Sequence, residues 1–187
     1  CWIQPRGYGN NWTCMLERRF PEVEAGTDPG DALTLEWDQR FAMEACYDYG
    51  YVEVSADSGG SWATLSSFTN LSCVFHPGIN RDWYTPEGHV VLDLSAYAGH
   101  PIDIRYRFSS DQTFSSQDEY NSPSTNPCLD GAWQLDNIHL WTMDGDNEVT
   151  LFLDDCESPG SNGWVTDDFP ATEQTGVVFR RSYEEFD

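Results

Sequence analysis

Acidic side chains dominate the chemistry available to this sequence of 187 residues, which has 32 aspartates and glutamates, nine arginines and no lysine. Ca²⁺ binds six to eight oxygen ligands, mostly carboxylates and carbonyls, so it suits a chain with so few basic partners for its acids. Asp136 lies in an apolar run between Leu135 and Ile138, and it needs a partner if it is buried. That partner is either a metal cation or one of the arginines Arg105 and Arg107. For the excess of acidic residues as a whole, the alternative to metal binding is an acidic surface exposed to solvent.

The net charge of −23 limits the partners that this protein can have. Nucleic-acid phosphates and anionic membrane surfaces would both be repelled, so we expect no nucleic-acid partner. No stretch approaches the roughly 18 apolar residues of a membrane span, and no membrane insertion is expected. The aromatic fraction of 14%, with eight tryptophans, argues against a disordered chain.

Six scattered cysteines, none of them in a Cys-x-x-Cys pair, indicate disulfides in an oxidising compartment rather than a zinc site. We therefore expect an extracellular or cell-surface protein whose cysteines are all disulfide-bonded, in a pairing that the sequence does not specify: Cys1, Cys14, Cys46, Cys73, Cys128 and Cys156. Two Asn-x-Ser/Thr triplets, at Asn11 and Asn70, are candidate glycosylation sites on such a surface.

Motifs that would indicate an enzyme are missing from the sequence. It contains no His-Glu-x-x-His, no Gly-x-Ser-x-Gly and no phosphate-binding glycine-rich loop before a helix. The histidines stand alone and are expected to be ordinary surface or half-buried residues: His76, His89, His100 and His139. Paired carboxylates for glycoside cleavage remain open among so many acids, but nothing singles out a pair. We expect a protein without catalytic activity.

Alternation of apolar and polar residues predicts a chain made of short strands. The clearest case is 102–108, where Ile102, Ile104, Tyr106 and Phe108 share one face. Further strands are expected at 32–37, 49–55, 89–94, 133–141, 149–153 and 176–180, punctuated by glycine and proline. This spacing favours two packed sheets, a β-sandwich. Two long loops, at 66–88 and 111–131, contain Cys73 and Cys128, and disulfides are expected to pin them.

Residues 55–62 fit the Asp-box pattern Ser-x-Asp-x-Gly-x-Ser-Trp. In such a hairpin turn the Asp57 carboxylate accepts hydrogen bonds across the turn, Gly59 or Gly60 supplies a positive φ, and Trp62 packs beneath it. We interpret the motif as structural rather than ligand-binding.

Several segments resemble, in order, the motifs of a known family: Leu33-Thr-Leu-Glu-Trp37, Glu44, residues 47–55, the Asp57 turn, and residues 92–99, 104–111 and 133–138. Over about residues 30–141 the chain resembles the MAM-like jelly-roll module of immune inhibitor A-type secreted metallopeptidases and many bacterial surface proteins. The resemblance implies a non-catalytic jelly-roll β-sandwich of two antiparallel sheets. It also implies a structural Ca²⁺ with ligands among Glu44, Asp48, Asp111 and Asp136. The family's Gly-Trp before the last of these reads Gly131-Ala-Trp133 here, a departure of one residue. With the acidic excess added, we expect at least one bound Ca²⁺.

The family's opening-strand motif, Phe-x-Asp-Asp-x-Glu-Ser and then Gly-Trp, stands at the opposite end of this chain, at 152–158 and 163–164. We therefore divide the chain into an N-terminal extension (1–30), a jelly-roll body (31–150) and a C-terminal segment (151–187). That segment either folds back onto its own sandwich, opens a next repeat or completes a neighbouring subunit's sheet; an ordinary C-terminal hairpin is the fourth alternative. Because the family's opening strand supplies metal ligands, the resemblance adds Asp154, Asp155 and Glu157 as candidates. Cys1 and Cys156 could then link neighbouring chains.

These features together predict a calcium-stabilised structural or adhesive module. Its expected partners are copies of itself or neighbouring domains, joined by head-to-tail strand exchange in a surface filament. The alternative is a carbohydrate-binding module of a larger secreted enzyme, with glycans as ligands. Aromatic rings in loop-like sequence could stack on sugars: Trp2, Trp12, Trp83, Tyr84 and Tyr120. The alternative role for these rings is to cover the core beneath the long loops.

Overall fold

The computed structural model describes residues 2–3, 8–41, 43–44, 46–69, 88–113, 115, 133–157, 160–169 and 180–181. Nearly all of its elements are strands: β1 (Trp2–Ile3), β2 (Thr13–Phe20), β3 (Leu33–Phe41), β4 (Tyr49–Ser55), β5 (Ala63–Phe68), β6 (His89–Asp93), β7 (Ile102–Ser109), β8 (Trp133–Asp144), β9 (Asn147–Asp154), β10 (Val165–Phe169) and β11 (Arg180–Arg181). One short helix, α1 (Glu22–Gly26), and one 3₁₀ turn, η1 (Ser95–Tyr97), complete the described part. In that part, no helix has the length and apolar character needed to cross a membrane.

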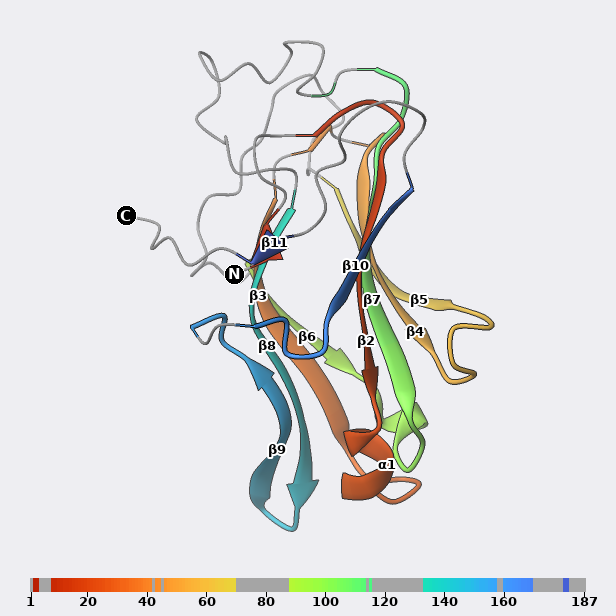
Figure 1. Ribbon diagram of the computed structural model, residues 1–187. Helices are drawn as coiled ribbons and strands as arrows, with labels where there is room; N and C mark the ends of the chain where they lie inside the picture. The colour runs from red at the N-terminus through yellow and green to blue at the C-terminus, as the bar shows by residue number, and fades with distance from the viewer. Residues whose placement is uncertain are drawn as a thin grey trace.

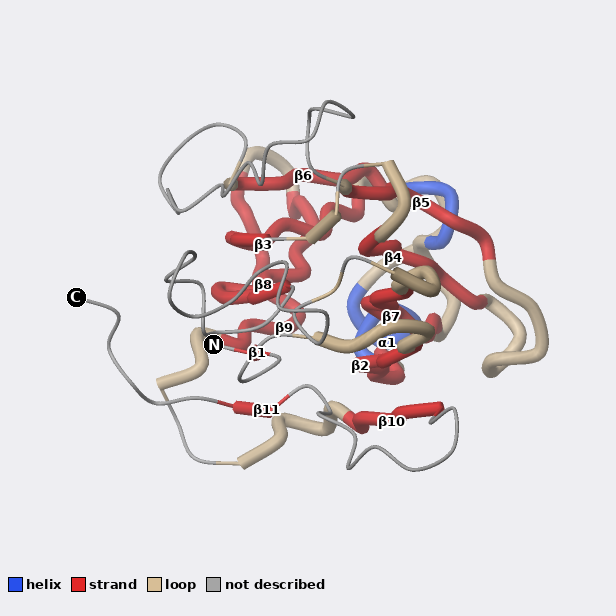
Figure 2. The backbone as a smooth tube through the Cα atoms, turned by 90° about the horizontal axis from the view of Figure 1, so that it is seen from above, coloured by secondary structure: helices blue, strands red, loops and turns tan. Residues whose placement is uncertain are grey.

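The strands form two antiparallel sheets, which lie face to face in Figures 1 and 2. One sheet has the order β11-β1-β8-β3-β6, with β9 also paired to β8; the other has the order β10-β2-β7-β4-β5. The chain changes sheet at most of its connections, as in a jelly roll. The predicted two-sheet β-sandwich is confirmed. Strand β2, which sequence patterns did not indicate, lies inside its sheet between β10 and β7.

The core lies between the two sheets and follows the predicted alternation. Ile102, Ile104, Tyr106 and Phe108 of β7 all point inward and are at most 1% exposed. At its centre, the Oε1 atom of Gln39 accepts hydrogen bonds from the indole N–H groups of Trp37 at 3.2 Å and of Trp133 at 3.0 Å. These two tryptophans are among the largest fully buried side chains, so β3 and β8 are tied together inside the sandwich.

In this single chain the C-terminal segment pairs with its own sandwich. Strand β9 pairs with β8, and β10 pairs with β2, so the segment joins both sheets (Figure 1). The rings of Phe152 and Trp164 pack against Phe20, with centroid separations of 5.2 and 5.8 Å. The segment that resembles an opening strand therefore contributes to the core of its own chain.

The turn after β4 has the hydrogen bonds expected of it. The Asp57 carboxylate accepts bonds from the backbone N–H of Ser61 at 2.7 Å and from the hydroxyl groups of Ser61 and Ser55. These bonds lower the pKa of Asp57 to about 2. Gly59 has the positive φ, 81°, that the turn requires. Hydrogen bonds among its own residues therefore hold the Asp57 turn in shape.

The prediction that all six cysteines form disulfides is wrong for two of them. Cys14 and Cys156 are buried thiols rather than halves of disulfides. Both lie in the apolar core, where a thiol packs as a small hydrophobic group. No disulfide joins two of the described cysteines; Cys46 is disulfide-bonded, and the other end of that bond lies outside the described residues. Cys1, Cys73 and Cys128 lie outside them too.

Candidate metal site

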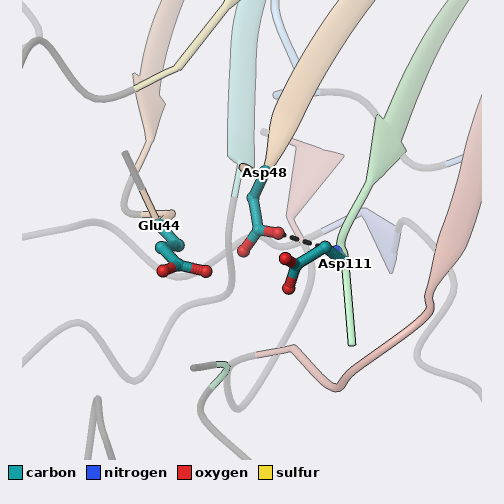
Figure 3. A group of neighbouring side chains, drawn as sticks. All are labelled: Glu44, Asp48 and Asp111. Atoms are coloured by element: carbon teal, nitrogen blue, oxygen red, sulfur yellow. Dashed lines mark hydrogen bonds between the residues drawn. The ribbon is translucent and has the colours of Figure 1, made fainter. Parts of the chain in front are cut away.

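Three carboxylates from two separate stretches of chain meet at one end of the five-stranded sheet. Glu44 lies in the connection after β3, Asp48 directly precedes β4, and Asp111 follows β7. Strands β4 and β7 are antiparallel neighbours with Tyr49 opposite Ser109, so the start of one lies beside the end of the other. The sheet register therefore brings Asp48 and Asp111 together. One ligand oxygen from each of the three residues lies within 4.8 Å of the others (Figure 3).

Backbone hydrogen bonds hold the three residues in place. The N–H of Asp111 donates to Oδ1 of Asp48 at 2.9 Å, and the N–H of Asp48 donates to the carbonyl of Glu44 at 3.2 Å. The N–H of Glu44 donates to the hydroxyl of Tyr8 at 2.9 Å. The N–H of Asn11 donates to the carbonyl of Asp111. The N-terminal stretch before β2 thus packs against the site, a role that no sequence motif indicated.

The site contains more negative charge than its surroundings neutralise. Asp48 is 0% exposed, yet its Oδ2 atom has no hydrogen-bond partner among the described residues, and neither has the buried Oε2 atom of Glu44. Burial and then the charges of Asp111 and Asp48 raise the pKa of Glu44 to about 7. Burial also raises the pKa of Asp48, despite its hydrogen bonds.

This arrangement could hold a metal ion. A buried carboxylate oxygen without a partner is unfavourable, and a cation bound between the three groups would offset their negative charge. The ligand set is all oxygen, which suits hard cations such as Ca²⁺ or Mg²⁺ better than it suits zinc.

The structure places the other four predicted ligands elsewhere. Asp136 belongs to β8 of the opposite sheet, where it faces Asp38, and burial raises its pKa. Asp154 is fully buried, and its Oδ1 atom accepts hydrogen bonds from the N–H of Cys156 at 3.2 Å and from the side-chain amide of Asn162 at 2.9 Å. The remaining two, Asp155 and Glu157, are exposed in the connection after β9. None of the four belongs to the Glu44–Asp48–Asp111 group.

The two arginines considered as partners for Asp136 bind another acid instead. Arg105 and Arg107 both bond to the nearly buried carboxylate of Glu53, at 2.6 and 2.9 Å. Their guanidinium groups also lie over the rings of Trp62 and Tyr51, at 4.1 and 4.2 Å from the ring centroids. The Glu53 carboxylate is therefore fully paired, and neither arginine is paired with Asp136.

The remaining candidate residues are only partly described. Asn11 is exposed just before β2, where a glycan would meet no burial constraint, whereas Asn70 lies outside the described residues. Of the five rings considered for sugar binding, only the side chain of Trp12 is described, and it packs against the core. The side chain of Trp2 and the residues Trp83, Tyr84 and Tyr120 lie outside the described part of the structure.

Compared with protein-family models and with curated proteins, the chain matches none.

Proposed function

We propose that this chain is an extracellular, non-catalytic β-sandwich module that is stabilised by Ca²⁺ bound at Glu44, Asp48 and Asp111. A single observation supports this proposal above others: two buried carboxylate oxygens in a group of three acids have no hydrogen-bond partner among the described residues. Groups of this kind are stable when a cation is bound between them.

Calcium fits this site better than other common cations. The three carboxylates offer up to six oxygens to an ion that takes six to eight, and neighbouring carbonyls or water can complete the shell. Mg²⁺ demands a tighter octahedral geometry and keeps more of its water, so it suits a site of several protein carboxylates less well. The expected role of the ion is structural, because it would fasten the connection containing Glu44 to the adjoining ends of β4 and β7.

The resemblance to MAM-like jelly-roll modules supports a structural or adhesive role rather than catalysis. The two-sheet sandwich agrees with that resemblance, and three of the seven candidate ligands that it implies lie together. The disulfide at Cys46 supports an oxidising, extracellular setting. As partners we propose copies of the same chain or neighbouring domains. Exchange of the C-terminal segment would form the β9–β8 and β10–β2 pairs between chains instead of within one.

Thermal melting of the whole chain tests the metal proposal. We expect a higher Tm with Ca²⁺ than with EDTA, and we expect Asp48→Asn to remove that difference. Asp155→Asn is the matched control, because this carboxylate is exposed and, within the described part of the chain, accepts a bond only from the nearby N–H of Glu157. Superimposable melting curves with Ca²⁺ and with EDTA would refute the proposal. Light scattering of the purified chain tests the strand-exchange proposal separately, and a strictly monomeric chain at high concentration would count against it.

A further inference from the structure

The side chain of Tyr8 connects the N-terminal stretch of the chain to the Glu44–Asp48–Asp111 group. Tyr8 is 3% exposed, and its ring packs edge-on against Phe108 of β7, with a centroid separation of 5.0 Å. Phe108 is itself fully buried, so the core of the sandwich holds the ring in place. The hydroxyl group at the far end of the ring therefore has a fixed position beside the acids.

That hydroxyl contacts two of the three acids. Its oxygen accepts a hydrogen bond from the backbone N–H of Glu44 at 2.9 Å, and its O–H donates to the carboxylate of Asp48. A tyrosine hydroxyl donates and accepts at the same time, so the two bonds are compatible. The Oδ2 atom of Asp48 still has no hydrogen-bond partner among the described residues, which leaves this oxygen for a cation. Tyr8 therefore orients Asp48 without occupying its second oxygen.

Pairing of β2 with β7 carries the N-terminal stretch to the site. Beyond the paired strands, the Ser110 hydroxyl donates to the carbonyl of Gly9 at 2.6 Å and accepts the N–H of Trp12 at 2.8 Å. The N–H of Ser110 donates to the carbonyl of Trp12 at 2.9 Å, which continues the strand pairing by one step. Residues 8–12 thus lie along the chain that leads from β7 to Asp111.

We propose that Tyr8 is a positioning residue of this metal site, whose hydroxyl holds Glu44 and Asp48 in the arrangement that binds Ca²⁺. This inference rests on the proposed function, because it requires the Ca²⁺ site. Carboxylates that bind a metal ion are themselves oriented by hydrogen bonds, and loss of such an outer partner weakens metal binding by roughly 10- to 100-fold. Tyr8 acts through its two neighbours, and it also joins the bound ion to the N-terminal stretch.

Calorimetric titration of the full chain with Ca²⁺ at constant pH tests this inference. Tyr8→Phe keeps the ring and removes only the hydroxyl, so we expect the Kd for Ca²⁺ to rise by about tenfold or more. Tyr106→Phe is the matched control, because it removes a buried hydroxyl that has no hydrogen-bond partner in the described part of the chain. Its Kd should equal that of the parent. A merely structural role of Tyr8 would lower the Tm in EDTA and leave the Kd unchanged.

The possible outcomes separate this inference from the proposed function. If the parent chain and Tyr8→Phe bind Ca²⁺ with equal affinity, the role of Tyr8 is overturned while the Ca²⁺ site stands. An equal loss of affinity in Tyr8→Phe and Tyr106→Phe would overturn that role too. A parent chain that binds no Ca²⁺ would overturn both the site and the role of Tyr8.

Hydrogen exchange of the parent chain gives a second test, which does not depend on the folding of a variant. Bound Ca²⁺ should slow exchange of the Glu44 N–H, which donates to Tyr8, because opening of this contact would then disturb the ion. The N–H of Ser61 is the reference, since it lies in the turn at the opposite end of β4. Unchanged exchange at Glu44 in the Ca²⁺-bound chain would overturn the inference.

Discussion

The main-chain N–H of Asp111 donates a hydrogen bond of 2.9 Å to the carboxylate of Asp48, although the two residues are 63 positions apart. This bond satisfies only one of the two Asp48 oxygens, and the second remains buried without a partner among the described residues. The contact therefore fixes the position of Asp48 without neutralising it. A rigidly held and under-neutralised carboxylate is the feature on which the proposed Ca²⁺ site depends.

Asp111→Asn separates the geometry of the site from its charge. The backbone N–H that donates to Asp48 remains, while one of three neighbouring negative charges is lost. We expect the metal-free protein to keep or slightly gain stability, because repulsion with Glu44 and Asp48 falls. The increase in Tm on adding Ca²⁺ should shrink markedly. Differential scanning fluorimetry with and without Ca²⁺ measures both effects, and an undiminished calcium shift would show that Asp111 is not a ligand.

Glu53→Gln should weaken the sandwich and change its response to acid. Burial raises the pKa of Glu53, but hydrogen bonds from Arg107 and Arg105 outweigh it and leave the pKa below its ordinary value of 4.5. The ionised carboxylate therefore stabilises the fold fully above pH 4.5, and that stability is lost as the pH falls through the lowered folded-state pKa.

We expect Glu53→Gln to lower the free energy of unfolding near pH 7 by about 1–3 kcal/mol. Below the ordinary pKa of glutamate the difference from the parent chain should narrow. Urea unfolding at a series of pH values measures this, with the exposed Glu24→Gln on α1 as control. If the free energies of unfolding of Glu53→Gln and the parent differed by the same amount at every pH, ionisation of Glu53 would not be the source of the stability.

Trp164→Ala tests whether the C-terminal segment belongs to the core of its own chain. The Trp164 ring is 3% exposed and packs against Phe20, Tyr106 and Phe152. Its removal should lower the free energy of unfolding by about 3–5 kcal/mol, as for other large rings deleted from cores. Val165→Ala removes a neighbouring side chain that is 66% exposed and should have little effect. If both variants unfold at the same denaturant concentration as the parent, the segment is not docked as described.

Thiol labelling tests the state of the cysteines. Burial raises the pKa of Cys156 to about 12, so almost no thiolate is present near pH 8. We expect iodoacetamide to leave Cys14 and Cys156 unmodified in the folded protein and to modify both after unfolding without reductant. Cys46 should react only after reduction, because it is disulfide-bonded. Peptide mass spectrometry identifies the modified residues, and labelling of Cys156 in the folded chain would contradict its burial.

The parts of this protein that sequence patterns predicted correctly are those governed by near neighbours in the chain. The alternation of Ile102, Ile104, Tyr106 and Phe108 specified which face of β7 is buried, because side chains of a strand alternate by geometry alone. The hydrogen bonds of the Asp57 turn were predictable for a similar reason, since donor and acceptor are only a few residues apart. Strand β2 escaped prediction because Arg18 interrupts its apolar face; this side chain covers the rings of Phe20 and Phe152 at 4.3 and 4.0 Å.

By itself the sequence determined a strand-rich, strongly acidic chain with a local pattern of buried faces and tight turns. A family resemblance indicated Glu44, Asp48 and Asp111 as candidate metal ligands. Only the register of β4 against β7 brings the last two side by side. Tertiary structure likewise decided that Cys14 and Cys156 are buried thiols and that the Tyr8 hydroxyl meets Glu44. The physical reason is that strand order and register determine which distant side chains meet and how deeply they are buried, and neither quantity is recorded in the spacing of residues along the chain.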